Sequence, residues 1–379
     1  MDGLGIAHSL GPFGVPVVIA DTDPYRPGLH SRYVRAYRLH SLSGPELIED
    51  LLAIHTQIRT RAILFPTTDM QVQAISEHRN RLCAAFRLHL PHPACLIRLM
   101  HKAAFQCEAE RLGFPIPKAI CIRNEEDLAK LKKIRFPAVI KPGDKALFFA
   151  NKAMRNRKVN SREEAENICR EVLPNAPDLI TQEWIEGSEH DIYFCLQYRG
   201  ANGETVCSFV GRKLRCWPPE TGSTASCIAA PEVAKPLERM TTAFFNKTCV
   251  VGMCSMEFKR DARNGEFFMV EPTIGRTDWQ EEIATLNGVN IPLAAYRYEI
   301  GLPGPALSLP RRPIPWMYPP SFWRAIVSTR SFRDGWRSIR RAKSAYFNLG
   351  DPLPFIYFMF EWARRLFGWR RWRELALGH

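Results

Sequence analysis

The 379-residue sequence predicts a protein of mixed α/β and α+β class with two or three subdomains. Two observations predict this class. Residues 1–95 alternate between amphipathic helices and short apolar strands, which is the rhythm of a parallel sheet covered by helices. Residues 118–304 mix strands, hairpins and helices without strict alternation, which is typical of an α+β unit with an antiparallel sheet. A proline-rich linker and a basic, aromatic, helical tail follow at residues 305–379.

Composition indicates an ordinary globular body with a strongly basic end. The apolar fraction is 46%, and the eleven cysteines form no CxxC pair or zinc-type spacing, so we expect reduced thiols in a cytoplasmic protein. The first residues lack the basic and apolar regions of a secretory leader. Of the net charge of +13, residues 311–379 contribute +10, from 14 Arg and Lys against four Asp and Glu.

Residues 1–95 are predicted to form a Rossmann-like domain. Its expected elements are three helices, at 3–10, 46–56 and 70–82, and two strands, at 15–20 and 63–65. A strand should precede the Gly3-Leu-Gly5 turn, and none does. Either the true start lies upstream or the sheet lacks its first strand, so these glycines are weak evidence for a nucleotide site.

Residues 96–184 carry two lysines in places that suit an anion. The expected elements are a helix at 96–117, strands at 119–122, 136–141 and 179–184, and helices at 125–133 and 161–172. Lys102 lies on the first helix, and Lys141 ends a buried apolar strand. A lysine at such a strand end either extends its amine to the surface or faces an anion, and the residues leave both readings open.

A hairpin with two glutamates dominates the region that follows. The expected elements there are strands at 191–198 and 205–211, a helix at 231–246, a hairpin of strands 250–259 and 266–271, and a long helix at 279–298. Asn264-Gly265 signals the tight turn of that hairpin. A three-residue loop, 263–265, would set Glu257 directly opposite Glu271, with Cβ atoms about 4.5–5.5 Å apart. A cation such as Mg²⁺ would relieve their repulsion; the alternative is a surface hairpin with two solvated glutamates.

Five features follow one another in a recognisable order: the nucleotide fold, the Lys102 helix before Gly113-Phe-Pro-Ile-Pro117, the strand ending at Lys141, the strand that leads into Glu186-Gly-Ser-Glu189, and the two-glutamate hairpin. In this order they resemble the ATP-grasp superfamily of carboxylate–amine ligases. Within it the chain looks closest to the D-aspartate-ligase-like and carbamoyl-phosphate-synthase-like branch. The resemblance implies an ATP-grasp fold at 96–304, with a small lobe near 118–184 and a large lobe near 185–304, behind a pre-ATP-grasp domain at 1–95.

The resemblance also implies an ATP site. The residues it assigns contact the phosphates, the adenine and the ribose in turn: Lys102 and Lys141 for the phosphates, Gln182 with the backbone of Glu183 and Ile185 for the adenine, and Glu189 for the ribose.

Metal-binding and catalytic roles are implied in the same way. Glu257, Glu271 and Thr273 would bind Mg²⁺ or Mn²⁺, and Arg276 would lie beside the transferred groups, with Arg212 and Lys213 as anchors for substrate or γ-phosphate. The sequence departs from the family pattern in three places: His101 replaces an aspartate, a basic segment (143–158) replaces a glycine-rich lid, and Thr273 replaces the usual asparagine.

The implied reaction joins a small-molecule carboxylate to an amine through an acyl phosphate, at the expense of ATP. Two alternatives stay open: a phosphotransferase that uses the same nucleotide site, and a catalytically weak ATP-binding scaffold anchored at the membrane.

The tail adds its own alternatives. Residues 354–373 suit the interface of an anionic membrane at its inner face, or packing on the body or across a homodimer. Nucleic-acid binding is disfavoured, because no recognised module accompanies the charge.

Overall fold

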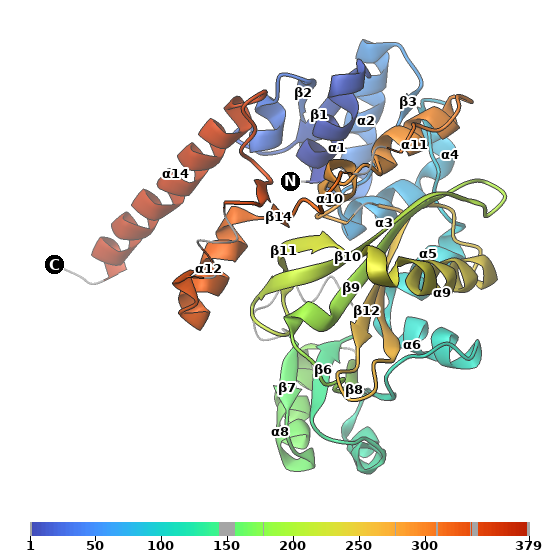
Figure 1. Cartoon of the computed structure of the whole chain (residues 1–379), viewed down its shortest axis with the longest axis vertical. Coiled ribbons are helices and arrows are strands. Elements are labelled where there is room, and N and C mark those ends of the chain that lie inside the picture. The colour runs from blue at the N-terminus through green and yellow to red at the C-terminus, as the bar shows by residue number, and fades with distance from the viewer. Residues whose placement is uncertain are drawn as a thin grey trace.

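The computed structural model describes residues 2–143, 156–176, 178–276, 278–307, 310–333, 335 and 340–376, with side chains as far as residue 364. Most of the basic segment predicted in place of a lid, residues 144–155, lies outside the described residues. Figure 1 shows an N-terminal domain at the top, a large sheet in the middle and a small sheet at the bottom, with helix α14 projecting to one side.

The N-terminal domain contains two pairs of parallel strands covered by helices, which confirms the predicted parallel rhythm. Its elements in chain order are α1 (Asp2–Leu10), η1 (Gly11–Phe13), β1 (Val17–Asp21), η2 (Pro27–His30), β2 (Val34–Arg38), α2 (Gly44–Ile58), β3 (Ala62–Ile63), α3 (Asp69–Glu77), α4 (Arg79–Leu82) and β4 (Phe86–Arg87). The predicted single helix 70–82 is two helices, which break at His78.

The small lobe is a four-stranded antiparallel sheet in the order β5-β8-β6-β7, packed on η3 and α8 through a core of aliphatic side chains. Its elements, with the two helices before it, are α5 (Pro93–Met100), α6 (Lys102–Arg111), β5 (Ala119–Ile122), η3 (Glu125–Lys133), β6 (Ala138–Pro142), β7 (Arg157–Val159), α8 (Arg162–Val172), η5 (Leu173–Asn175) and β8 (Leu179–Glu183).

The predicted single helix 96–117 is wrong. His101 adopts an extended conformation (φ −87°, ψ 120°) between α5 and α6. The Lys102 N–H donates to Gly143 O at 3.0 Å instead of continuing α5. This tertiary bond places Lys102 at the start of a new helix, beside the end of β6.

The large lobe is built on a seven-stranded sheet in the order β13-β12-β9-β10-β11-β14-β15. Its elements as far as the tail are η6 (Glu189–Asp191), β9 (Ile192–Arg199), β10 (Thr205–Trp217), β11 (Ser223–Ala229), η7 (Pro231–Val233), α9 (Ala234–Lys247), β12 (Gly252–Arg260), β13 (Phe267–Ile274), α10 (Glu282–Leu286) and α11 (Ile291–Glu299). The predicted long helix 279–298 is wrong: Gly288 has φ +87°, which ends the helical path, and Asn290 caps α11.

Two short strands of the tail pair with this sheet at its edge. β14 (Trp316–Met317) pairs with β11, and β15 (Lys343–Ser344) pairs with β14. Between them lies α12 (Pro319–Thr329), and α14 (Leu353–Ala376) follows. The side chain of Tyr318 packs on Trp279, with ring centroids 4.6 Å apart. No helix in the described part of the chain is long and apolar enough to cross a membrane.

The hairpin of β12 and β13 pairs Glu257 with Glu271, which confirms the predicted register. The connection differs from the expected one: residues 262–265 form the turn, and the Asp261 N–H donates to Glu266 O at 2.8 Å. That turn alone would shift the register by one residue. A bulge at Val270 absorbs the shift, since Phe258 pairs with Met269 and Glu257 with Glu271.

A buried polar network joins the N-terminal domain, α10 and the tail. His8 contacts Glu282 Oε1 at 2.9 Å and Asp351 Oδ2 at 3.1 Å. Asp351, which is fully buried, also accepts hydrogen bonds from Ser31 Oγ at 2.5 Å and Arg32 N at 3.0 Å. Burial lowers the pKa of His8, but Glu282 and Asp351 outweigh burial and raise it above the ordinary value.

We expect Asp351→Ala to lower the free energy of unfolding by about 2–4 kcal/mol, because it leaves buried hydrogen-bond donors without an acceptor. Protonated His8 makes its full contribution to the stability of the wild type below about pH 6.5. This contribution is lost as the pH rises through the raised pKa of His8. Urea unfolding at pH 6 and pH 8 should therefore show a larger stability difference for wild type than for the variant. Glu125→Ala, which breaks an exposed pair with Arg170, should leave the free energy of unfolding nearly unchanged. Equal effects of the two changes would refute the role of the network.

Candidate active site

A cavity of about 1570 Å³ lies where the N-terminal domain, the small sheet and the large sheet meet. This volume exceeds that of a typical single-ligand pocket, about 300–1000 Å³. The predicted site residues that line it are Lys102, Lys141, Gln182, Glu183, Ile185, Lys213, Glu257, Glu271, Thr273 and Arg276. Glu189 and Arg212 are not among its lining residues.

The small lobe contributes two lysines and an oriented amide. Lys141, at the end of β6, donates from Nζ to Gln182 Oε1 at 2.9 Å. Gln182 Nε2 donates to Gln106 Oε1 at 3.0 Å, and Gln106 is itself held by Pro117 O at 2.8 Å. This chain of bonds determines which way the Gln182 amide faces. Its oxygen is turned to the lysine.

The charge on Lys141 is destabilised in this cavity. Burial and then the neighbouring Lys102 lower the pKa of Lys141 to about 8, and Glu271 and Glu257 only partly offset them. Two ammonium groups that repel each other in a cavity wall are both stabilised by an anion bound near them. The donor set therefore fits the phosphates of a nucleotide.

The strand end that follows Gln182 is rigidly held. The Glu183 N–H donates to Lys118 O at 2.8 Å, and the Trp184 N–H donates to Pro137 O at 3.0 Å. The Glu183 carboxylate is bound by Arg135, at 3.1 Å from Nε and 2.8 Å from Nη2. The side chain of Glu183 is thus a structural anchor, and Glu183 and Ile185 are both among the residues that line the cavity.

Glu189 and Arg212 take other positions. The two carboxylate oxygens of Glu189 accept the backbone N–H groups of Cys216 and Glu220, both at 3.1 Å, and so hold the loop that follows β10. Arg212 precedes Lys213 on β10, and successive strand residues point to opposite faces. Its Nε is buried without a hydrogen-bond partner among the described residues.

Lys213 lies against the glutamate pair. Its Nζ is 2.5 Å from Glu257 Oε2, and the residue is only 4% exposed. Burial favours the neutral amine, but the Glu257 carboxylate outweighs it and raises the pKa of Lys213 above its ordinary value. A charged lysine therefore relieves part of the repulsion between Glu257 and Glu271. A metal site remains a prediction, because within the described ranges no group of three or more His, Cys, Asp or Glu side chains could hold an ion by itself.

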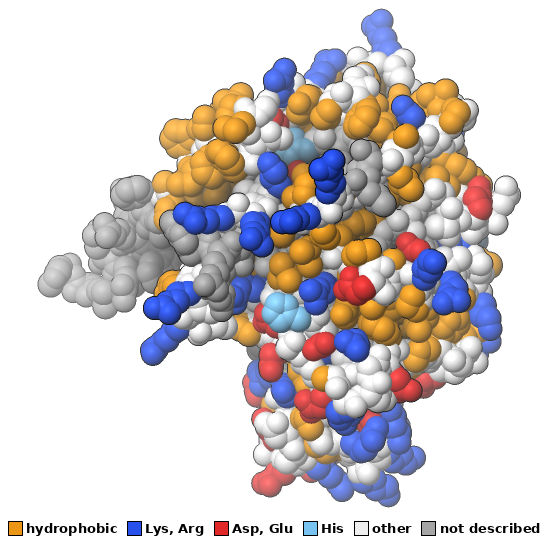
Figure 2. All heavy atoms as spheres, viewed as in Figure 1, with side chains coloured by type: hydrophobic (Ala, Val, Ile, Leu, Met, Phe, Trp, Pro, Cys, Tyr) orange, Lys and Arg blue, Asp and Glu red, His pale blue; other side chains and the backbone are white. Residues whose placement is uncertain are grey.

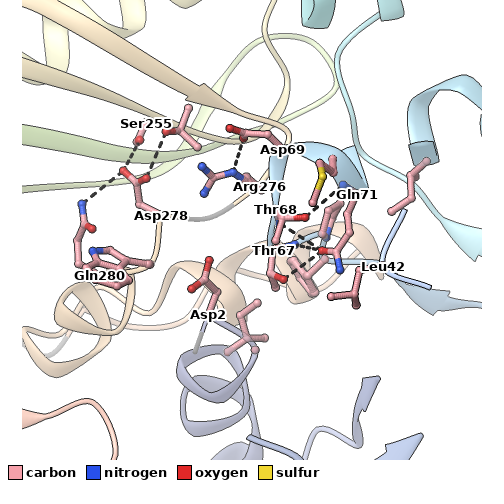
Figure 3. Close-up of a pocket in the computed structure, with 18 of the residues that line it drawn as sticks. Asp2, Leu42, Thr67, Thr68, Asp69, Gln71, Ser255, Arg276, Asp278 and Gln280 are labelled. Atoms are coloured by element: carbon pink, nitrogen blue, oxygen red, sulfur yellow. Dashed lines mark hydrogen bonds and ion pairs between the residues drawn. The ribbon is translucent and has the colours of Figure 1, made fainter. Parts of the chain in front are cut away.

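Thr273 contacts a carboxylate that the sequence analysis missed. Its Oγ1 donates to Asp278 Oδ1 at 3.2 Å. Ser255 Oγ donates to Asp278 Oδ2 at 2.6 Å (Figure 3). The only sequence signal was an acid two residues after Arg276. A carboxylate thus stands next to the threonine that replaces the family's asparagine.

Arg276 joins the hairpin to the N-terminal domain. Its Nε lies 2.5 Å from Asp69 Oδ1, at the first residue of α3 (Figure 3). Burial opposes the charge of Arg276, but Asp69 raises its pKa. The sequence analysis did not identify Asp69 as a site residue. The sequence Thr-x-x-Gln does predict the capping box that Thr68 and Gln71 form at the start of α3.

No protein-family model matches the chain. It is 21% identical over 280 residues to the D-aspartate ligase of Enterococcus faecium (strain Aus0004), a match that spans 69% of this chain and 66%, slightly under two thirds, of that ligase.

Solved structures share its fold. N5-carboxyaminoimidazole synthetase from Staphylococcus aureus, in complex with ADP, superposes with a TM-score of 0.65 at 12% identity, over 83% of this chain and 78% of that one. The biotin carboxylase domain of the Hydrogenobacter thermophilus 2-oxoglutarate carboxylase, solved with MgADP and bicarbonate, gives 0.59 at 17%, over 82% and 69%. These comparisons confirm the ATP-grasp fold and the resemblance to the superfamily of carboxylate–amine ligases.

The lowered pKa of Lys141 predicts pH-dependent nucleotide binding. Titration calorimetry with MgATP should show affinity falling as pH rises above about 8, by up to tenfold per unit, because the neutral amine no longer attracts phosphate. Lys141→Met should bind weakly and lose this dependence. Lys133→Met, at an exposed lysine of η3, should behave as wild type; a pH profile that survives in Lys141→Met would exclude this lysine as its origin.

Proposed function

We propose that this chain, with its ATP-grasp fold, is an ATP- and Mg²⁺-dependent ligase that joins a carboxylate to an amine. The observation that carries the proposal is the convergence of three groups in one cavity: the Lys102–Lys141 pair, the Glu257–Glu271 pair and Arg276. Cations for phosphate, carboxylates for a metal and a cation for a developing oxyanion are the parts that phosphoryl and acyl transfer require. We expect the reaction to take place in the cytoplasm.

The lining of the cavity supports the following assignment of residues to ATP. Lys102 and Lys141 would contact its phosphates, and the backbone of Glu183 and Ile185 with the Gln182 amide would contact its base. Glu257, Glu271 and Thr273 would ligate Mg²⁺ or Mn²⁺, which when bound neutralises phosphate charge. Glu189 and Arg212 would act from outside the cavity lining, by supporting the loop after β10 and the opposite face of the strand.

The proposed chemistry has two steps. A carboxylate oxygen of the substrate attacks the γ-phosphorus, the bond to the β-phosphate oxygen breaks, and ADP leaves with that electron pair. The amine nitrogen then attacks the acyl carbon of the acyl phosphate, the carbon–oxygen bond breaks, and phosphate leaves as the nitrogen loses a proton. Arg276 and Lys213 would stabilise the oxyanions of both steps, because both cations line the cavity and keep their charge.

The N-terminal side of the cavity suits the amine. Asp278 and Asp2 both face the space beside Arg276 (Figure 3). Carboxylates there would attract a cationic amine and, in the case of Asp278, accept the proton it releases. The relative from Enterococcus faecium is named for D-aspartate, so amino acids belong among the amines to be tested.

The decisive experiment measures ADP and phosphate release from MgATP with a panel of carboxylates paired with amines, including D- and L-amino acids. A ligase requires both acceptors, and product mass spectrometry should show an amide. Glu271→Gln should lower the rate at least about a hundredfold, because a metal ligand in the transition state is lost. Glu266→Gln, at the exposed turn of the same hairpin, is the matched control.

The other outcomes separate the alternatives. Phosphate transfer to one acceptor without amide formation would identify a phosphotransferase. ATP binding without turnover in any pair would leave a binding scaffold and contradict the ligase.

Asp278→Asn tests the amine side. It removes the charge and keeps the shape, so we expect KM for the amine to rise about 10–100-fold while KM for ATP stays within about twofold. Steady-state kinetics with varied amine and with varied ATP measure both values. A rise in KM for ATP alone would instead place Asp278 at the nucleotide.

A further inference from the structure

Helix α14 is held against the N-terminal domain along one face. Pro354 and Glu361 are buried there, and Arg26 Nη1 donates to Glu361 Oε1 at 3.3 Å. The ring of Tyr357 stacks on His30, and Arg364 lies over the ring of Tyr25, 4.7 Å from its centroid. These contacts determine the rotation of the helix about its axis.

The opposite face of α14 is apolar and exposed. Leu353, Ile356, Met359 and Phe360 follow one another at helical spacing, with exposures of 46%, 43%, 42% and 66%. Figure 1 shows the helix projecting from the body, and in Figure 2 hydrophobic side chains gather at the same place, at the upper left of the molecule. A row of large apolar side chains in water usually marks a binding surface.

The exposed charges of the tail have one sign, although Arg364 also lies 3.9 Å from Asp23 of the N-terminal domain. In the described part of the tail, every Arg and Lys is exposed: Arg311, Arg312, Arg324, Arg330, Arg333, Arg340, Arg341, Lys343 and Arg364. The described acids of the same stretch, Asp351 and Glu361, are both buried. The tail therefore presents cations and apolar side chains to its surroundings.

We propose that α14 and its flanking cations form a docking surface for an anionic phospholipid bilayer. The apolar row would enter the interface, and the arginines would contact lipid phosphates. A second copy of the chain is a poorer occupant, because two tails of net charge +10 would repel each other. An anionic surface removes that repulsion. The four side chains of the apolar row are not among the residues that line the cavity described above, and the docking proposal is independent of the proposed reaction.

Vesicle flotation with the full-length protein tests the proposal. We expect co-flotation with phosphatidylcholine–phosphatidylglycerol vesicles, weak binding to pure phosphatidylcholine, and release as salt rises. The double variant Ile356→Ser/Phe360→Ser should reduce binding at least about tenfold while circular dichroism and thermal unfolding stay unchanged. Phe13→Ser removes a comparably exposed phenylalanine, at 58% against 66% for Phe360, from the N-terminal domain and should bind as wild type.

Three results would overturn the proposal. They are absence of binding by the wild type, equal binding to neutral and anionic vesicles, and binding by the double variant at wild-type strength. Sedimentation equilibrium of both proteins tests the rival occupant. If the wild type is a dimer and the double variant is a monomer, this face binds a second copy of the chain. ATP turnover without vesicles is a separate measurement, so failure here leaves the ligase proposal standing, and the converse also holds.

Discussion

Two carboxylates held opposite each other across one hairpin are the constraint around which the cavity is arranged. Glu257 and Glu271 are paired by the backbone and cannot separate without breaking the β12–β13 ladder. Lys213, from the neighbouring part of the sheet, lies against Glu257 and stays charged because of it. Two carboxylates held at this spacing offer the oxygen ligands that a divalent cation prefers, which is the physical reason to expect a divalent metal with its phosphates at this place.

The lysines that line the same cavity raise the corresponding problem for positive charge. Burial and then the charge of Lys102 lower the pKa of Lys141. A polyanion that carries metal ions would relieve both walls at once, since its phosphates satisfy the lysines while its cations satisfy the glutamates. The lysine pair and the glutamate pair are therefore complementary to one ligand. Arg276, paired with Asp69, links this arrangement to the N-terminal domain.

Local sequence patterns predicted many of the strands and helices correctly, and the incorrect predictions share a cause. Strand Ala119–Ile122 and the pairing of Glu257 with Glu271 came out as predicted. The helices expected at 96–117 and 279–298 are each two helices, because a bond from Lys102 to Gly143 and a glycine with positive φ interrupt them. The hairpin register was right although the turn was not, since the bulge at Val270 compensates for it. Distant contacts and bulges leave little trace in periodicity.

By itself the sequence determined the class of fold and the order of its parts, because strand and helix periods and turn residues act locally. The residues expected at an ATP-grasp site came from the resemblance to that superfamily. Only the tertiary structure decided which of those residues share a cavity. It turned Lys213 toward Glu257 and Arg212 away, used Glu189 to hold a loop, and brought Asp69 and Asp278 to the site. The physical reason is that a side chain's partners come from other strands and helices, whose approach is set by packing of the whole chain.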